Sequence, residues 1–432
     1  MDAILWISQN GKSIMKKSFT KLLALIVTAT LAMPVCAMEY VGSPYSSQAL
    51  AQAAMNAPEA VADVELPEEE EEDEDKWNWE FSVQSGFWAN QWGATGGVQE
   101  YGVPGGWDYF GQGGNTAAGL NIDNTGFQLY EFYAAGSREY KLDGDWKFLV
   151  QSDFMYGTNA QFYQSGNRFD YMALSKGQYG FAIAQLYAGI GTDKFNVIVG
   201  KFGCPIDNPG DGFFFSDSYN PWPDTHMGVL ATWEPCEAIN FTLGWTQGWN
   251  EAFDGDSDSS LVWFGMSRQL TNAIRLSYMM CAGNMEGYEN TYSHCLVLET
   301  KLSDKLTYYL GYDFMSLVNG EDDNTKLWGL NNSFIYEINE KVQAGLRLEY
   351  QEELVADEVV GRFEVTLGYS ISPFKDCTPR HKRCCLAPCR MMSGELVIRP
   401  EIRYDNWNGD NGFNDCTKSY QFSGGVSLDY SF

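Results

Sequence analysis

VQAGLRLEYQ (residues 342–351) and RFEVTLGYSI (residues 362–371) are the two stretches that decide the fold of this chain. In the first, the apolar Leu346 and Leu348 alternate with the charged Arg347 and Glu349. Successive side chains of a β-strand point to opposite faces, so this period of two predicts a strand with one apolar and one charged face. The second stretch repeats the pattern and predicts another strand of the same kind.

The same alternation recurs through residues 77–432. We expect sixteen strands, which begin near residues 77, 126, 145, 179, 195, 225, 238, 260, 273, 292, 305, 325, 341, 358, 395 and 418. An even number of strands with one apolar face is typical of an all-β transmembrane antiparallel up-and-down β-barrel. A soluble β-sandwich alternates too. Here, however, tight polar turns alternate with longer Gly-, Asp- and Asn-rich loops, as they do in outer-membrane barrels.

Charged side chains occupy one face of these strands. A lipid-facing arginine at the bilayer midplane would cost roughly 2–4 kcal/mol, so we expect the charged face to line a water-filled interior. Opposite charges there would either orient polar solutes or form salt bridges that stiffen the wall. The alternation alone does not assign Lys201 or Arg268 to either face, because apolar residues flank both on each face. The predicted pore-lining residues are Arg347, Glu349, Arg362, Glu364, Arg399, Glu401, Arg403 and Asp405.

The first 76 residues differ in composition from the rest. Residues 1–37 are a signal-peptide region, in which three lysines precede an apolar run and a small-residue cleavage site, and Met15 is the expected start. Residues 38–76 are an Ala- and Ser-rich arm with eight consecutive acids at residues 68–75, which we expect to be disordered and solvated. Residues 77–432 are the expected barrel. Export without a spanning helix predicts that the barrel lies in the outer membrane, in contact with its lipid.

The composition argues against several functions. The chain has 57 acidic and 28 basic residues, a net charge of −29 that would repel nucleic acid. With three histidines, no metal centre or other cofactor is expected. Ser218, Asp224 and His226 could form a hydrolase triad, but nothing positions an oxyanion hole, so we do not expect an enzyme. Acidic loops at residues 254–258 and 321–324 fit either surface calcium sites or ordinary polar loops.

A basic, cysteine-rich insertion lies at residues 376–394. Disulfides are expected there in an oxidising compartment, and zinc binding or cross-linking to another chain are the alternatives. The candidates are Cys377, Cys384, Cys385 and Cys389. We hypothesise that the acids of residues 68–75 bind this insertion. Two independently solvated charged segments are the alternative, because exposed ion pairs contribute little.

Two further stretches carry a family resemblance. VIVGKFGCPIDNPGDGFFFSDSYNPWPDTHMGVLATW (residues 197–233) and VIRPEIRYDNW (residues 397–407) resemble the OmpL-like β-barrel porin family. With the strand rhythm, the resemblance extends over about residues 77–432. It implies an outer-membrane barrel for passive solute passage, without catalytic residues. The chain departs from the family pattern at Ile206-Asp207-Asn208 and in the cysteine-rich insertion.

These observations predict an outer-membrane porin through which small hydrophilic solutes or ions diffuse. The excess of acidic residues predicts a weak preference for cations, provided that the acids reach the interior. The alternative is a non-conducting structural or adhesive barrel whose interior is plugged by loops such as residues 90–125. A homo-oligomer and a monomer are both compatible with the sequence.

Overall fold

Alternating apolar and polar residues form strands through most of the described chain. The computed structural model describes residues 77–91, 126–165, 169–170, 179–206, 210–219, 222–253, 258–285, 288–319, 323–355, 358–374, 395–408 and 417–432. These residues form sixteen β-strands, and each starts within four residues of its predicted position. The signal-peptide region, the acidic arm and the cysteine-rich insertion, with its four disulfide candidates, lie outside the described residues.

The two shortest strands, β5 and β7, have 9 and 8 residues, and β8–β16 have 12 to 17. Among the described residues, no helix is long and apolar enough to cross a membrane. The short helical elements are α3 (Ala160–Tyr163) and the 3₁₀ turn η2 (Asp211–Phe213). The strands are β1 (Asn78–Asn90), β2 (Gly126–Lys141), β3 (Lys147–Gly157), β4 (Gly180–Thr192), β5 (Phe195–Gly203), β6 (Thr225–Cys236), β7 (Ile239–Thr246), β8 (Ser260–Thr271), β9 (Ile274–Met285), β10 (Tyr288–Ser303), β11 (Leu306–Asn319), β12 (Asp323–Asn339), β13 (Val342–Val355), β14 (Glu358–Ile371), β15 (Glu395–Trp407) and β16 (Tyr420–Ser431).

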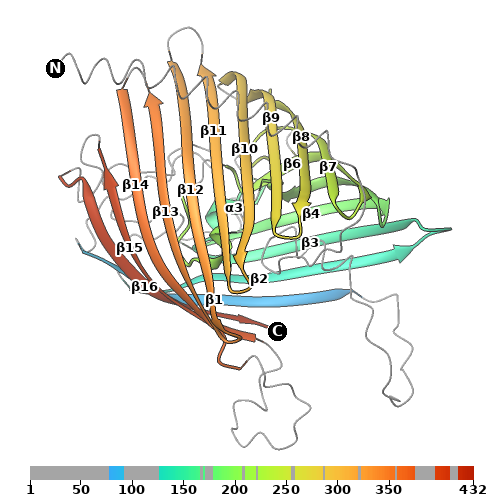
Figure 1. The fold of residues 1–432 in the computed structure, drawn as a ribbon. Helices are drawn as coiled ribbons and strands as arrows, with labels where there is room; N and C mark the ends of the chain where they lie inside the picture. Colours follow the sequence, from blue (N-terminus) through green and yellow to red (C-terminus); the bar gives the residue numbers. More distant parts are fainter. Residues whose placement is uncertain are drawn as a thin grey trace, which may run out of the picture.

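The sheet closes on itself (Figure 1). Each strand pairs antiparallel with the next one in sequence, and β1 pairs with β16, where Val83 lies opposite Tyr430. Closure leaves no strand edge without a partner, which a hydrocarbon layer without water requires. The predicted antiparallel up-and-down barrel is therefore confirmed.

The two faces of the wall differ in exposure. On β15, Glu401 and Arg403 are 4% and 2% exposed, while Ile402 between them is 63% exposed. On β13, Arg347 is 0% exposed and its neighbour Leu346 is 36% exposed. The apolar side chains thus cover the outside and the charged ones lie inside, as the alternation predicts.

The alternation of buried and exposed residues fails locally at the end of β5, next to a glycine with a positive φ. Gly200 has a positive φ of 140°, which residues with a side chain rarely adopt. After this irregularity, Lys201 and Phe202 are both buried. Both faces of β5 carry apolar residues, which is why the sequence pattern did not assign Lys201 to a face.

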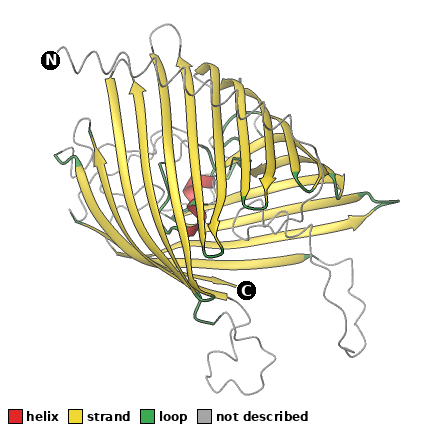
Figure 2. Cartoon of the chain, viewed as in Figure 1, coloured by secondary structure: helices red, strands yellow, loops and turns green. Residues whose placement is uncertain are grey.

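The connections follow the predicted asymmetry only in part. The turns at one end are tight, such as residues 193–194 and 304–305, and the connection between β5 and β6 at the other end is long. However, β9 and β10 are joined at that second end by residues 286–287 alone, and β13 and β14 by residues 356–357 alone. Figure 2 shows α3, on the connection between β3 and β4, on the inner side of the barrel wall.

Candidate functional site

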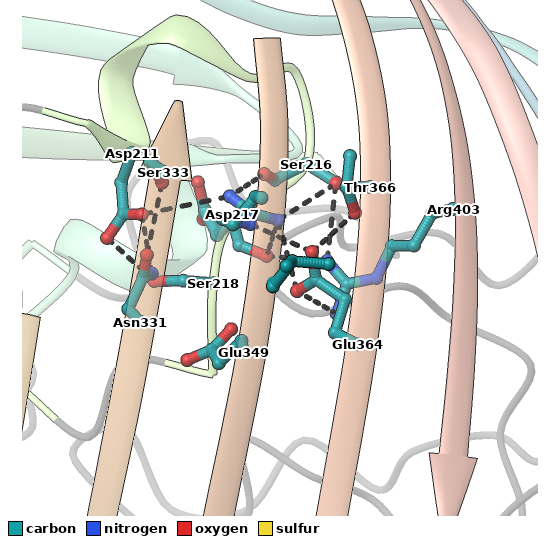
Figure 3. A network of polar contacts seen from close by, with 12 residues as sticks. Asp211, Ser216, Asp217, Ser218, Asn331, Ser333, Glu349, Glu364, Thr366 and Arg403 are labelled. Atoms are coloured by element: carbon teal, nitrogen blue, oxygen red, sulfur yellow. Dashed lines mark hydrogen bonds and ion pairs between the residues drawn. The ribbon is translucent and has the colours of Figure 1, made fainter. Parts of the chain in front are cut away.

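The segment between β5 and β6 turns into the interior of the barrel. Its described residues 210–219, called the inner loop below, begin with η2 and contact β12, β13 and β15 (Figure 3). The rings of Phe213 and Phe214 pack against Gly345 on β13, where a Cβ atom would overlap the ring of Phe213. A glycine at this inward position lets the inner loop approach the wall closely.

Arg347 on β13 binds both the inner loop and the wall. Its Nη1 donates to the carbonyl oxygen of Ser216 and its Nη2 to that of Asp217, each at 2.9 Å. Its Nε donates to Glu364 on β14 at 2.8 Å, and Arg403 on β15 pairs with the same carboxylate at 3.2 Å. Both arginines are buried, so these ion pairs are shielded from water and removing one partner would leave an uncompensated charge.

Side chains of β15 hold the same part of the inner loop. The carboxylate of Glu401 accepts the backbone N–H groups of Phe215 (2.7 Å) and Ser216 (3.2 Å), and it also accepts the Ser216 hydroxyl. Nη1 of Arg403 donates to the carbonyl oxygen of Asp217 at 2.6 Å. Hydrogen bonds to ionised groups are roughly twice as strong as those between neutral groups, so the loop backbone is held firmly by two strands.

Tyr219 fixes the end of the inner loop. Its backbone N–H donates to Glu349 at 2.8 Å, and its hydroxyl donates to Asp405 at 2.7 Å. Its carbonyl oxygen accepts Nε2 of Gln351 at 2.6 Å. The guanidinium of Arg403 lies over its ring, 5.2 Å from the centroid. Side chains of the barrel wall therefore contact both the backbone and the ring of Tyr219.

Asp211 fixes the beginning of the inner loop. Its carboxylate accepts the Ser218 hydroxyl and Nδ2 of Asn331 on β12, each at 2.8 Å. Enclosure within the barrel raises the pKa of Asp211 above its ordinary value, and the guanidinium of Arg347 lowers it part of the way back. The inner loop therefore has anchors at its start, its middle and its end.

The eight predicted pore-lining residues fall into two groups. Five contact the inner loop directly: Arg347, Glu349, Glu401, Arg403 and Asp405. Glu364 joins the two arginines that hold the loop. Arg362 pairs with Glu353 at 2.7 Å, and the half-buried Arg399 pairs with Asp429. Most of these charged residues therefore hold the inner loop. That they also line an open pore stays a prediction.

The network around the inner loop contains more acidic than basic side chains. Asp217 is exposed to the interior, and enclosure by the barrel raises its pKa to about 6. Among the described side chains of this network, six carboxylates stand against two guanidinium groups, namely Asp211, Asp217, Glu349, Glu364, Glu401 and Asp405 against Arg347 and Arg403.

Further charges face the inner loop from other strands. Glu131 on β2 interacts electrostatically with Asp429 on β16, with Arg399 and with Asp217. Sequence reasoning singled out neither Glu131 nor Asp217 nor Asp429 as site residues. Asp429 alternates with the apolar Leu428 and Tyr430 and could have been found from the pattern. Asp217 lies in a loop, which has no period to reveal it.

A second inward segment carries α3. The ammonium of Lys201 donates to the carbonyl oxygen of Tyr163 at 2.7 Å and to the hydroxyl of Ser165 at 3.0 Å, and it pairs with Asp170 at 3.4 Å. Lys201 is therefore inside the barrel, where it ties this segment to β5. Arg268 is also buried, at 8% exposure.

The contacts do not assemble the catalytic alternative, whereas the metal alternatives fall mostly on residues outside the described ranges. The Ser218 hydroxyl donates to Asp211, and Nδ1 of His226 bonds the carbonyl oxygen of Gly248, so the two side chains do not bond each other there. Within the described ranges, no group of three or more His, Cys, Asp or Glu side chains is arranged to hold a metal ion. Residues 254–257 and 320–322, which include most of the two acidic loops, lie outside those ranges.

Comparison with known families gives a decisive match. The family described as "Putative beta-barrel porin-2, OmpL-like" matches residues 109–432. The chain belongs to this family. The match starts at residue 109, after β1, and so covers a somewhat shorter range than the resemblance noted in the sequence, which begins near residue 77. A comparison with curated protein sequences gave no match.

Several solved structures similar to this chain are outer-membrane proteins. A loop-deletion mutant of OmpT from Vibrio cholerae is 10% identical with a TM-score of 0.53, over 83% of this chain and 100% of that one. The outer membrane channel DcaP of Acinetobacter baumannii is 9% identical with a TM-score of 0.52, over 83% and 97%. An anion-selective porin from Comamonas acidovorans is 11% identical with a TM-score of 0.52, over 83% and 100%. At these identities the likeness concerns the fold.

Proposed function

We propose that this OmpL-like porin is a non-enzymatic outer-membrane channel through which small hydrophilic solutes and ions diffuse passively, narrowed by the inner loop. The observation that carries the proposal is the inner loop itself, which is held against β13 and β15 by buried arginines and carboxylates. A segment fixed in this way restricts the cross-section of a barrel that is otherwise too wide for side chains to fill.

We further propose a weak preference for cations. The six carboxylates and two guanidinium groups around the inner loop support it, together with Glu131 and Asp429, which lie near Arg399. Negative potential in a low-dielectric passage raises the local concentration of cations. The selectivity of the Comamonas acidovorans porin does not transfer, because the two chains share only the fold.

Planar-bilayer recording tests both parts of this proposal. The purified protein is expected to give discrete current steps. In a potassium chloride gradient, the reversal potential is expected to have the sign of potassium permeation. A lipid bilayer without current steps would favour the alternative of a structural or adhesive barrel. A reversal potential of the opposite sign would overturn the cation preference.

The cation preference is expected to weaken between pH 7 and pH 5. The pKa of Asp217 lies near 6, above its ordinary value, so this carboxylate is mostly charged at pH 7 and mostly neutral at pH 5. Reversal potentials measured at these two pH values should therefore move toward zero at the lower one. Asp217→Asn is the matched control, and it should have a smaller preference at pH 7 and a smaller change with pH. An equal pH response in both proteins would contradict the assignment of the pH dependence to Asp217.

A homo-oligomer stays a prediction for this chain. OmpT of Vibrio cholerae, which has a similar fold, is described in a trimer form. Chemical cross-linking in outer-membrane vesicles, followed by denaturing electrophoresis, distinguishes a single chain from an assembly.

A further inference from the structure

The hydrogen-bonded wall of the barrel is interrupted between β4 and β5. The ladder between these two strands ends where Leu186 lies opposite Lys201. Beyond this pair, residues 180–185 of β4 lie beside β3, and among the described residues none of them pairs with β5. The next residues of β5, Phe202 and Gly203, pair with β6. The two strands therefore separate along nearly half of β4, and this interruption is called the wall gap below.

An interruption of this kind is costly in a membrane protein. In an antiparallel strand, the backbone N–H and C=O groups of every second residue point to the same side. At the wall gap, β4 lacks the neighbouring strand that would bond the groups on its β5 side. Hydrocarbon offers no hydrogen bonds in place of water, so these groups need partners from elsewhere in the protein.

The segment that carries α3 supplies such partners from the inner side of the wall (Figure 2). Its described residues 160–165 and 169–170 are called the wall strap below. Oδ2 of Asp170 accepts the backbone N–H of Ile183 at 2.8 Å, and Nε2 of Gln164 donates to the carbonyl oxygen of Phe181 at 2.8 Å. Gln164 and Asp170 are buried. Because Phe181 and Ile183 are two residues apart, these side chains bond one edge of β4 as a strand would.

Lys201 connects the wall strap to β5. Its ammonium lies 3.4 Å from Oδ2 of Asp170, the oxygen that also accepts the Ile183 N–H, and it donates to the hydroxyl of Ser165 at 3.0 Å. Oδ1 of Asp170 accepts the backbone N–H of Ser165 at 2.8 Å, which fixes the orientation of the carboxylate. Lys201, Ser165 and Asp170 are all buried, so water does not compete for these contacts.

A third side chain crosses the wall gap from β4 itself. Oε1 of Gln185 accepts the backbone N–H of Gly203 on β5 at 3.3 Å, while its Nε2 donates to Asp153 on β3. Side chains thus replace the missing ladder from both strands that border the gap.

We propose that the wall strap closes the barrel at the wall gap, and that Asp170 joins the two sides through Ile183 on β4 and Lys201 on β5. The strap is then a fixed part of the wall. The inner loop differs, because it lies against β13, whose ladder with β14 is complete from Val342 to Val355. The closure does not depend on whether the barrel conducts.

Hydrogen–deuterium exchange of the full-length protein in lipid nanodiscs, resolved to single residues by mass spectrometry, tests the proposal. In the parent protein, the amide of Ile183 should exchange as slowly as the amides of residues 186–192, which lie in the β4–β5 ladder. Exchange of the Ile183 amide as fast as that of the turn at residues 193–194 would overturn the proposal.

The double variant Asp170→Ala/Lys201→Met removes the acceptor of the Ile183 amide without leaving an unpaired buried ammonium. The Ile183 amide should then exchange about ten-fold faster or more, while residues 186–192 keep their parent rates. The folded band on heat-modifiable gels should also be lost at a lower temperature than in the parent protein.

Asp211→Ala is the matched control, because it removes a carboxylate that anchors the inner loop. Its Ile183 amide should keep the parent exchange rate. An unchanged rate in the double variant, or an equal rise in Asp211→Ala, would also overturn the proposal. If the double variant forms no barrel, the Ile183 rate in the parent protein still decides the outcome.

Discussion

Replacing Arg347 with methionine is expected to raise the single-channel conductance several-fold and to make the current noisy. The substitution removes two hydrogen bonds to the inner-loop backbone and one ion pair with Glu364. Removing one partner of a buried ion pair costs about 3–5 kcal/mol. Because Arg403 still pairs with Glu364, the barrel wall should persist while the inner loop leaves its position. Planar-bilayer recording of the two proteins measures the change.

A matched substitution separates loop release from a general loss of charge. Arg275 on β9 donates to the Ser267 hydroxyl of the neighbouring strand at 2.9 Å. Arg275→Met removes the same charge from the barrel and should leave the conductance near the parent value. Heat-modifiable mobility on gels, which reports a closed barrel, should be retained by both variants. A parent-like conductance in Arg347→Met would show that the inner loop does not depend on this arginine.

Replacing Gly345 with valine is expected to have the second largest effect, a marked decrease in conductance. A Cβ at Gly345 would overlap the ring of Phe213 and crowd that of Phe214, 3.0 Å away. Overpacking of this kind costs about 1–3 kcal/mol. Because Glu401 and Arg403 hold the following residues from β15, the inner loop should shift toward the open part of the interior and narrow it. Liposome swelling with sugars of graded size measures the narrowing.

A neighbouring glycine provides the control for this experiment. Gly329 lies on β12, and a Cβ there would be 3.6 Å from the carbonyl oxygen of Tyr350, an ordinary contact distance. Valine suits a strand at both positions, so Gly329→Val should leave the size limit unchanged. An unchanged size limit in Gly345→Val, or an equal change in both variants, would contradict the packing of the inner loop against β13.

The strands and their two faces could be predicted because their physical cause is local. Leu346 and Arg347 are neighbours in sequence, so their side chains point to opposite faces of the strand in any surroundings. Contact with lipid excludes arginine from one of those faces. For the same reason the number of strands, the pairing of β1 with β16 and the inward position of the charged residues agree with the structure. The position of Lys201 could not be predicted, since apolar residues flank it on both faces of β5 and its partners come from the separate segment that carries α3.

The sequence by itself determined the barrel and the charges of its inner face. Only the tertiary structure decided what those charges do. Arg347 and Glu401 meet the inner loop across 131 and 185 residues of sequence, counted to Ser216. No periodic pattern encodes such contacts, because they depend on where the closed barrel brings its wall and on the direction in which a connecting segment turns. The charged face that suggested a water-lined passage therefore proved largely to hold the segment that crosses it.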